Sequence, residues 1–200
     1  MTTQIQEWTD SFGDDYTRRN AATDEEVNKR EYMWREILKK VDEPLSALEV
    51  GANVGANLRA LRRIIGNNLL AVEPNDYARI ILAQDGFRCE NSTADHLPYP
   101  DNVADLVFTC GVLIHVPPEK LLASMREIYR CAKRYVCAVE YFSDKPQMVV
   151  YRGKADLLFK RDFGAMYLDH FPDLLLRDCG FFWKRSTGLD NLTYWLFEKL

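Results

Sequence analysis

The stretch SALEVGANVGAN, residues 46–57, decides the fold of this chain. Its apolar run at 47–50 has the length and composition of a buried strand, and Gly51 and Gly55 follow directly. Apolar residues then recur at spacings of three and four through residue 65, which predicts a helix. A strand, a glycine turn and a helix in this order form the first unit of a nucleotide-binding α/β sheet. Both glycines suit the turn, because a Cβ would obstruct a backbone that passes close to a ligand.

The amino-acid sequence of the glycine turn limits the class of ligand that it can bind. Dinucleotide sites usually read G-x-G-x-x-G, whereas the corresponding positions here hold Gly51, Asn53 and Ala56. Glu49 precedes the turn, and its carboxylate would repel a pyrophosphate but suits a ligand with an ammonium and a sulfonium group. This pattern, E-x-G-x-x-x-G, resembles the cofactor loop of S-adenosylmethionine (SAM)-dependent methyltransferases. A glycine turn without a ligand is the alternative.

A second acid strengthens the ligand interpretation. The apolar run at 69–72 predicts a buried parallel strand, and it ends in Glu73 and Pro74. An acid at the end of the second strand is placed to accept hydrogen bonds from both ribose hydroxyls of a nucleoside. A solvated glutamate at a strand end is the alternative, but the glycine unit upstream favours ribose binding.

Strands and helices continue to alternate along the chain. Further strands are predicted at 87–89, 103–110, 135–141, 180–184 and 192–199. Further helices are predicted at 23–41, 77–84, 119–132 and 163–178, the last with a break near Pro172. The final two strands form an antiparallel hairpin. The predicted fold is therefore α/β and Rossmann-like: a seven-stranded, mostly parallel sheet with a C-terminal antiparallel hairpin.

Two segments outside this alternation are candidates for the acceptor side of a site. Trp8, Phe12 and Tyr16 recur at four-residue spacing, and this aromatic face either packs the N-terminus onto the domain or forms a lid. Residues 144–161 are rich in aromatic and basic side chains and predict an insertion above the carboxyl ends of the strands. We expect one domain over 1–200: lid and helix in 1–43, cofactor-binding core in 44–142, acceptor-side insertion in 143–163, and C-terminal helix and hairpin in 164–200.

Composition limits the class of protein. The 200 residues are 47% hydrophobic and 28% charged, as expected of one compact soluble domain. The net charge of −4 argues against a nucleic-acid partner, and the absence of a long apolar run argues against a membrane. Five cysteines without a C-x-x-C pair predict free thiols, most of them buried, in the reducing cytoplasm. The scattered histidines lack the spacing of zinc ligands, so no metal is expected.

Over nearly its whole length, the order of motifs resembles the class I SAM-dependent methyltransferases. A closer likeness is to a small clade, the pseudaminic-acid-biosynthesis-associated methylases. It rests on the segments SFGDDY (11–16), GVLIH (111–115), YRG (151–153), LFKRDFG (158–164), PDL (172–174) and LFEK (196–199). The resemblance implies SAM as cofactor and a small-molecule acceptor, with O-methylation of a sugar or nonulosonic acid intermediate in surface polysaccharide biosynthesis. Alternatives are N- or carboxyl-methylation of another metabolite, and a non-catalytic partner protein with this fold. An NAD-dependent dehydrogenase fits the turn and the final hairpin less well.

The resemblance also implies cofactor-binding residues. Asn53 replaces a usual glycine, which is tolerable because asparagine adopts left-handed conformations readily. In the adenine loop Thr93 stands where many families have an aspartate, so either Thr93 with the Ala94 amide or Asp95 contacts the adenine. The implied cofactor-binding residues are Glu49, Gly51, Asn53, Gly55, Glu73, Pro74, Thr93, Ala94, Asp95, Cys110 and Gly111.

On the acceptor side, His115 is the candidate catalytic base. An acceptor hydroxyl stays protonated at neutral pH and needs a base, whereas an amine or a carboxylate needs much less help. The alternative is a structural histidine bonded to a loop carbonyl. Candidate substrate-binding residues are Tyr16, Arg19, Tyr151 and Arg152, and the arginines favour an anionic acceptor such as a carboxylated or phosphorylated sugar.

Overall fold

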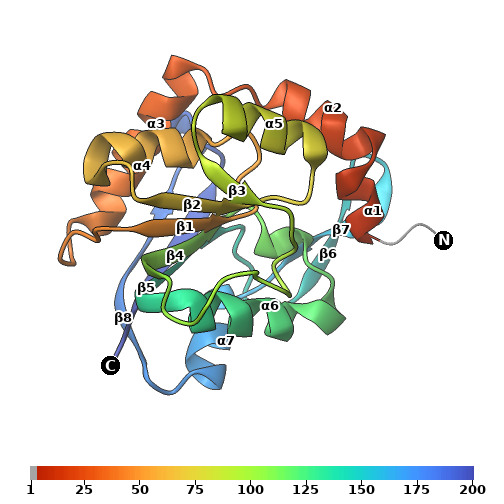
Figure 1. Cartoon of the computed structure of the whole chain (residues 1–200). Helices are drawn as coiled ribbons and strands as arrows, with labels where there is room; N and C mark the ends of the chain where they lie inside the picture. The colour runs from red at the N-terminus through yellow and green to blue at the C-terminus, as the bar shows by residue number, and fades with distance from the viewer. Residues whose placement is uncertain (1–3) are drawn as a thin grey trace.

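A seven-stranded sheet forms the centre of the molecule (Figure 1). The computed structural model describes residues 4–200, with side chains described for 5–153 and 157–200. The strand order is β3-β2-β1-β4-β5-β9-β8. The strands are β1 (Ala47–Val50), β2 (Leu69–Val72), β3 (Arg88–Glu90), β4 (Ala104–Cys110), β5 (Ala132–Glu140), β8 (Leu174–Phe182) and β9 (Leu192–Lys199).

The pairing of these strands confirms the predicted topology. Strand β1 pairs in parallel with β2 on one side and β4 on the other, and β5 continues the parallel series. Strand β9 runs antiparallel to both β5 and β8, so it lies between them in the sheet. The predicted C-terminal hairpin is therefore present, with the short helix α8 (Lys184–Thr187) in its connection.

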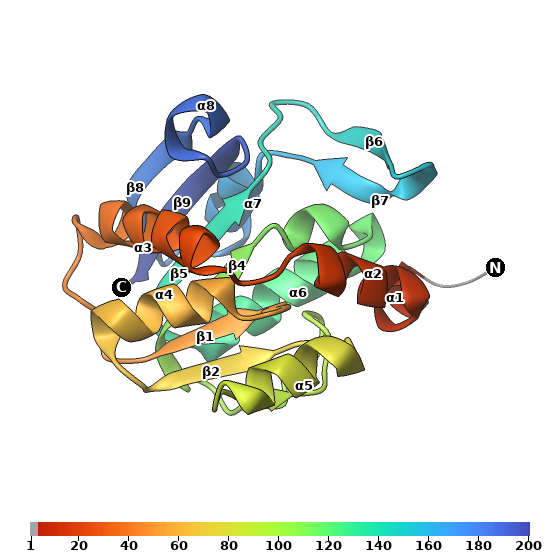
Figure 2. The same ribbon diagram turned by 90° about the horizontal axis from the view of Figure 1, so that it is seen from above.

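Helices cover both faces of the sheet (Figures 1 and 2). Helices α3 (Asp24–Leu38), α4 (Ala56–Ile65) and α5 (Asp76–Gln84) lie on one face, and α6 (Pro118–Cys131) and α7 (Phe163–His170) on the other. Successive side chains of a strand point to opposite faces, so β4 contributes Leu106 and Phe108 to one apolar core and Val107 to the other. Burial on both faces explains why the central strands are continuous apolar runs.

Two further units lie at one end of this layered structure (Figure 2). Helices α1 (Gln4–Thr9) and α2 (Ser11–Arg19) form the N-terminal unit. Strands β6 (Gln147–Tyr151) and β7 (Lys154–Lys160) form a separate two-stranded antiparallel sheet. The short 3₁₀ helix η1 (Leu113–His115) packs against β7. The N-terminal unit and the two-stranded sheet therefore both lie close to the turn that follows β4.

The structure corrects the predicted ends of the C-terminal elements. Helix α7 ends at His170, well short of the predicted residue 178, and the sixth strand of the sheet begins at Leu174 instead of residue 180. Pro172 disfavours helical continuation, and the leucines after it pair their backbone with β9. The insertion at 144–161, for which no regular structure was predicted, is the β6–β7 hairpin.

The break between the two N-terminal helices lies at Asp10, and Gly13 is inside α2. A Cβ on Gly13 would lie 1.8 Å from the carbonyl oxygen of Trp8, so the glycine is needed for the close packing of α1 on α2.

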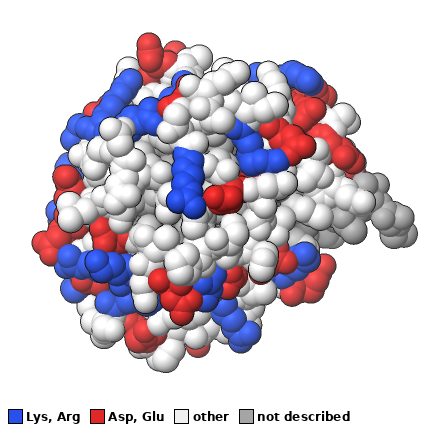
Figure 3. Space-filling view, viewed as in Figure 1, with Lys and Arg blue, Asp and Glu red and all other residues white. Residues whose placement is uncertain are grey.

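The surface charges are locally compensated. Figure 3 shows basic and acidic side chains interspersed over the face drawn there. Arg130, for example, pairs with both Asp101 and Glu127 at 2.9 and 2.8 Å. All five cysteines are free: Cys131 and Cys137 are buried, Cys89 and Cys110 are partly buried, and Cys179 is exposed. Over residues 4–200, no helix has the length and apolar composition needed to cross a membrane.

Candidate cofactor and acceptor site

A cavity of about 670 Å³ opens beyond the carboxyl ends of β1, β2 and β4. This is the crevice where open α/β sheets bind ligands, because the strand order reverses there. Most of the predicted site residues line it: Tyr16, Glu49, Gly51, Asn53, Glu73, Pro74, Thr93, Ala94, Asp95, Cys110, Gly111 and His115. Four others are not among the lining residues: Arg19, Gly55, Tyr151 and Arg152.

The glycine turn has the left-handed backbone that its sequence requires. Gly51, Asn53 and Gly55 have φ angles of 77°, 44° and 74°. A Cβ on Gly51 would also lie 2.6 Å from the Val112 side chain, and one on Gly55 would lie 2.6 Å from Leu82. The glycines therefore serve the turn and its packing. The sequence interpretation, close approach to a ligand, does not describe Gly55, which faces the protein interior.

Glu73 is a buried carboxylate held by the two loops beside it. It is 7% exposed. Its Oε2 accepts the Asn53 backbone N–H at 2.8 Å, and its Oε1 accepts the Asn75 backbone N–H at 2.9 Å. Each carboxylate oxygen accepts more than one hydrogen bond, so acceptor capacity remains for a ribose diol in the cavity. Burial raises the pKa of Glu73, and the two backbone N–H groups act in the opposite direction.

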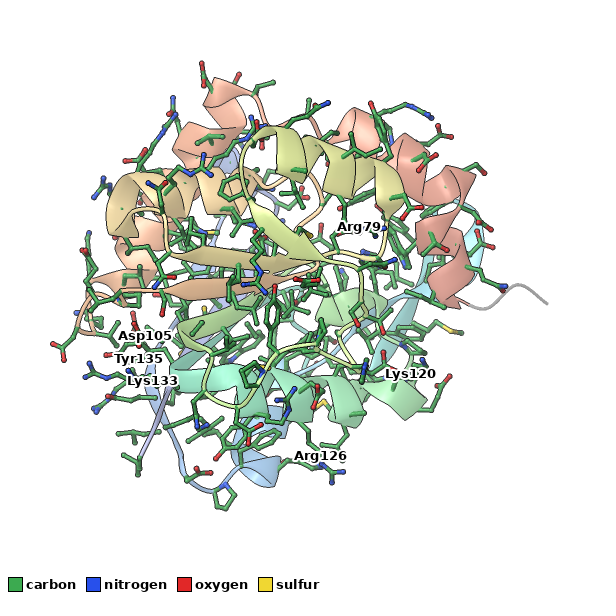
Figure 4. The ribbon with its side chains drawn as sticks, in the orientation of Figure 1. Arg79, Asp105, Lys120, Arg126, Lys133 and Tyr135 are labelled. Atoms are coloured by element: carbon green, nitrogen blue, oxygen red, sulfur yellow. The ribbon has the colours of Figure 1, made fainter. Side chains whose placement is uncertain are left out.

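Arg79 stabilises the turn that follows Glu73. Its guanidinium donates to the backbone carbonyls of Glu73 and Pro74 at 2.9 and 2.8 Å. Figure 4 shows this side chain extending from α5 toward the end of β2. The helix after the second strand therefore fixes the orientation of the strand-end acid, a role that the sequence alone did not indicate.

Glu49 is the other buried acid of the cavity, and it is 1% exposed. Its Oε1 accepts from Asn57 Nδ2 at 2.7 Å, and Asn57 Oδ1 accepts from Trp34 Nε1 at 3.3 Å. Its Oε2 has no hydrogen-bond partner among the described residues. Burial raises the pKa of Glu49 to about 8. Asn57 was missed at the sequence level, although it is the last residue of the diagnostic stretch.

The adenine-loop candidates form one hydrogen-bonded unit. Thr93 donates its hydroxyl proton to Asp95 Oδ1 at 2.6 Å, and Lys120 Nζ lies 2.9 Å from Asp95 Oδ2. Burial acts to raise the pKa of Asp95, but Lys120 and Thr93 outweigh it and the pKa is lowered. Lys120, at the start of α6 beside this loop (Figure 4), is a further cavity residue that sequence reasoning missed.

His115 lies in the cavity wall and also bonds a backbone carbonyl, that of a residue in β7, so it has features of both sequence interpretations. Its Nδ1 lies 2.5 Å from the Leu157 carbonyl oxygen, to which an Nδ1–H group donates. In this tautomer Nε2 carries the lone pair. The imidazole packs against the rings of Trp8 and Tyr151, with centroid distances of 4.6 and 5.3 Å. Burial lowers the pKa of His115 to about 4, so the ring is neutral at pH 7.

A buried acid that the sequence interpretation missed holds the turn of His115. Glu140 at the end of β5 is fully buried. Its carboxylate accepts backbone N–H groups from Val112, Leu113 and Ile114 at 3.2, 3.1 and 3.4 Å. Burial raises the pKa of Glu140 to about 7. The available signal was an acid directly after an apolar run, residues 135–139, which resembles the pattern that identified Glu73.

The N-terminal helices are hydrogen-bonded to the loops around Glu73. Thr17 donates to Asn53 Oδ1 at 3.0 Å. The Asn75 side-chain amide donates to the Trp8 carbonyl at 3.1 Å and to Asp14 Oδ1 at 3.0 Å. Asn53 and Asn75 are the two residues whose backbone N–H groups hold Glu73, so α1 and α2 close the cavity above that acid.

The candidate substrate contacts are placed unequally. Tyr16 lines the cavity, and Tyr151 lies behind His115. Arg19 and Arg152 are exposed, with the Arg152 guanidinium 5.5 Å from the Tyr151 ring centroid. Arg30, on α3, lines the cavity and was not among the predicted residues. Among the residues with described side chains, no group of three or more His, Cys, Asp or Glu residues is arranged to hold a metal ion.

Comparisons with known proteins agree with this geometry. Residues 48–135 match a family model described as a methyltransferase domain. The 1,6-didemethyltoxoflavin-N1-methyltransferase of Burkholderia thailandensis, solved with 1,6-didemethyltoxoflavin and S-adenosylhomocysteine, superposes with a TM-score of 0.71 at 16% identity, covering 98% of this chain and 86% of that one. A SAM-dependent methyltransferase of Leishmania major gives 0.74 at 15%, covering 98% and 87%. Magnesium protoporphyrin IX methyltransferase of Synechocystis PCC 6803, with bound SAM, gives 0.72 at 11%, covering 100% and 99%.

A comparison with curated protein sequences found no match. The matched segment begins at Leu48 in β1 and ends in β5, so it contains Glu49, Glu73 and His115. Glu49 Oε2, which has no hydrogen-bond partner among the described residues, suits a positively charged group of SAM. The Glu73 carboxylate suits the ribose hydroxyls of SAM. Residues 48–135 therefore match a methyltransferase domain, and the chain has the fold of these SAM-dependent methyltransferases.

Proposed function

We propose that this protein is a SAM-dependent enzyme that methylates a hydroxyl group of a small-molecule acceptor, a sugar or a nonulosonic acid intermediate of surface polysaccharide biosynthesis. The observation that supports this most directly is the position of His115. Its imidazole lines the same cavity as Glu73, and its Nδ1 is bonded to a carbonyl. A neutral imidazole with its lone pair on Nε2 suits an acceptor whose proton must be removed.

When bound, SAM supplies a methyl group on a positively charged sulfur, and its thioether departs without needing a proton. The residues of this chain then have two tasks. Glu49, Glu73 and the glycine turn would hold the donor, and the cavity walls would align the acceptor with it. His115 would take the proton of the acceptor hydroxyl on Nε2 during methyl transfer.

The acceptor class is supported by the walls of the cavity. Trp8 and Tyr16 line it with their rings in edge-to-face contact at 5.3 Å, and Trp8 also packs against His115. Aromatic rings of this kind present an apolar face and a polar edge, which suits the C–H face of a sugar ring. The resemblance to the pseudaminic-acid-associated clade supports the same class. Two of the structural neighbours are named as methyltransferases of small molecules, 1,6-didemethyltoxoflavin and magnesium protoporphyrin IX.

A second candidate is methylation of a carboxylate or an amine. The burial that lowers the pKa of His115 to about 4 also weakens it as a base. A carboxylate is already deprotonated at neutral pH and needs no base, and a free amine needs little help. On this alternative His115 orients the acceptor by accepting a hydrogen bond.

Product formation by purified protein tests the proposal. The protein is incubated with SAM and, in parallel, with neutral sugars, sugar acids, nonulosonic acids, amines and simple carboxylic acids. Mass spectrometry then measures S-adenosylhomocysteine and the methylated product. We expect turnover with a hydroxylated sugar acid and formation of a methyl ether. A methyl ester or a methylamine would favour the second candidate. Tight S-adenosylhomocysteine binding without turnover of any acceptor would favour a non-catalytic partner protein.

A further inference from the structure

Glu140 is a carboxylate inside the protein without a cation beside it. It lies at the end of β5 and is fully buried. Within the described part of the chain it forms no ion pair, and backbone N–H groups are what lower its pKa against the effect of burial. Burial, with the charge of Glu140 adding to it, raises the pKa of three neighbouring side chains, so they stay neutral at pH 7: Tyr167, Cys110 and Cys137. A buried carboxylate is costly unless hydrogen bonds satisfy it, so its donors indicate its role.

The donors to Glu140 come from the turn that carries His115. The backbone N–H groups of three successive residues, 112–114, converge on its carboxylate at 3.1–3.4 Å. The His115 backbone N–H in turn donates to the Val112 carbonyl at 2.8 Å, which closes the turn on itself. Successive N–H groups that converge in this way form a concave site for one anionic group. Glu140 therefore fixes the backbone from which the imidazole projects.

The ring of His115 has a separate anchor, the Leu157 carbonyl of β7, at 2.5 Å from Nδ1. Both anchors belong to one segment of the chain, because β5 ends at Glu140 and leads directly into the β6–β7 hairpin. The base of this hairpin is closed by the Ser143 N–H, which donates to the Arg161 carbonyl at 3.2 Å. The position of the turn relative to β7 thus depends on the end of β5.

We propose that Glu140 is a positioning residue for the reaction: it keeps the turn of His115 in register with β7, so that the Leu157 carbonyl selects one tautomer of the imidazole. A carbonyl oxygen only accepts, so it requires the ring proton on Nδ1 and leaves the lone pair on Nε2. A displaced turn would release the ring from this carbonyl and populate the Nε2–H form, which cannot take a proton at that atom. This inference rests on the proposed function, in which His115 takes the acceptor proton on Nε2.

The ring ¹⁵N resonances of histidine report the tautomer directly. The chain has three histidines, so the labelled, ligand-free protein gives three ring spectra, and His115→Gln identifies that of His115. Spectra at pH 7 compare wild type with Glu140→Gln, which removes the charge, and Glu140→Asp, which draws the charge back by one methylene. The matched control is Glu127→Gln, because Glu127 also accepts a backbone N–H, that of Leu97 at 2.8 Å, but does not line the cavity.

We expect wild-type His115 to be a neutral ring with its proton on Nδ1. Both Glu140 variants should shift the ratio of tautomers toward Nε2–H by about three- to tenfold, the effect of one weakened hydrogen bond. Glu127→Gln should leave the His115 spectrum unchanged.

A double-mutant cycle on kcat, measured with the accepted substrate, separates positioning from stability. Glu140→Gln should lower kcat about tenfold when His115 is present and less than about twofold in the His115→Gln background, because it acts through the imidazole. Binding of S-adenosylhomocysteine should stay within about twofold of wild type throughout.

Several outcomes would overturn the inference. An unchanged His115 tautomer in the Glu140 variants, or a wild-type ring with its proton on Nε2, would do so and leave methyl transfer itself untouched. Equal losses of kcat with and without His115 would mean that Glu140 only stabilises the fold. If the thermal transition shows that Glu140→Gln does not fold, Glu140→Asp provides the same test. If His115→Gln itself keeps its kcat, the proposed base and this inference fail together.

Discussion

The two parts of the cavity that we assign to the methyl donor and to the acceptor, here called the donor half and the acceptor half, are built in different ways. The donor half consists of the ends of β1 and β2: Glu49 is the last residue but one of β1, and Glu73 directly follows β2. The acceptor half brings together residues of α1 and α2, η1 and β7, which are distant in the chain. A local sequence pattern determines the first half, whereas tertiary contacts assemble the second. Substitutions in the two halves should therefore have separable effects, on donor binding and on turnover respectively.

The largest effect is expected in the acceptor half, for His115→Gln. Loss of the proton acceptor should lower kcat about 100-fold or more and leave S-adenosylhomocysteine binding unchanged. Steady-state rates with the accepted substrate, together with titration, check both parts. His170→Gln is the control, because His170 is an exposed histidine whose Nδ1 also lies near a backbone carbonyl, that of Met166. A kcat that falls less than threefold would support an acceptor that needs no base.

In the donor half, Glu73→Gln should weaken S-adenosylhomocysteine binding by roughly 10- to 100-fold. The amide keeps the size of the side chain but removes its charge. It also places an NH₂ donor opposite one of the two backbone N–H groups whose hydrogen bonds the carboxylate accepts. Glu90→Gln is the matched control, because Glu90 is the last residue of β3 and its side chain pairs with Arg88. Equal losses in the two variants would contradict a specific role for Glu73.

Glu49, in the donor half, should make the free energy of unfolding depend on pH. Burial raises its folded-state pKa to about 8, above the ordinary value, so the folded protein holds a proton that the unfolded chain releases. This contribution to the free energy of unfolding is present below the ordinary carboxyl pKa and is lost as the pH rises toward 8. Asn57, Arg30 and the Leu58 N–H oppose the shift, and Glu73 adds to it.

Chemical denaturation of the ligand-free protein between pH 5 and 8 measures this dependence. We expect the wild-type free energy of unfolding to fall with pH relative to Glu49→Gln, by on the order of 1 kcal/mol or more over this range. Glu140 titrates in both proteins and cancels in the difference. Parallel curves for the two proteins would show that Glu49 is ionised in the ligand-free site.

A smaller effect is expected for Lys120→Gln, because its ion pair with Asp95 is half exposed and such pairs contribute little. Binding of S-adenosylhomocysteine should weaken about two- to fivefold as the adenine loop loosens. Arg126→Gln is the control: Arg126 is exposed on the same helix and points away from the sheet (Figure 4). A loss as large as that of Glu73→Gln would mean that Lys120 contacts the donor directly.

The sequence predicts the donor half of the cavity better than the acceptor half. Glu73 was found because a buried strand and a terminal acid are adjacent in the chain. The β6–β7 hairpin was not found, because its turn is Arg152-Gly153, with φ angles of 51° and 81°. Positive φ at both turn positions is normally signalled by asparagine, aspartate or glycine, and arginine there gives no signal.

Other residues escaped prediction because their environment is set by distant elements. Arg30 occupies an ordinary helix position, and only the packing of α3 turns its face toward the cavity. Arg19 and Arg152 illustrate the converse, since both are basic residues in suggestive segments and both are exposed. Glu140 differs from these, because its local pattern resembled that of Glu73 and was available in the sequence.

The hydrogen bonds from the N-terminal helices to Asn53 and Asn75 have a kinetic consequence. The backbone N–H groups of these two residues donate to Glu73. The helices therefore cover the Glu73 end of the cavity only while the loops around Glu73 keep this arrangement. Entry of the donor must then precede completion of the acceptor wall, and the spent donor must leave last. We expect a compulsory order, with S-adenosylhomocysteine a competitive inhibitor against SAM and a noncompetitive one against the acceptor. Competition against both substrates would mean that the two ends of the cavity open independently.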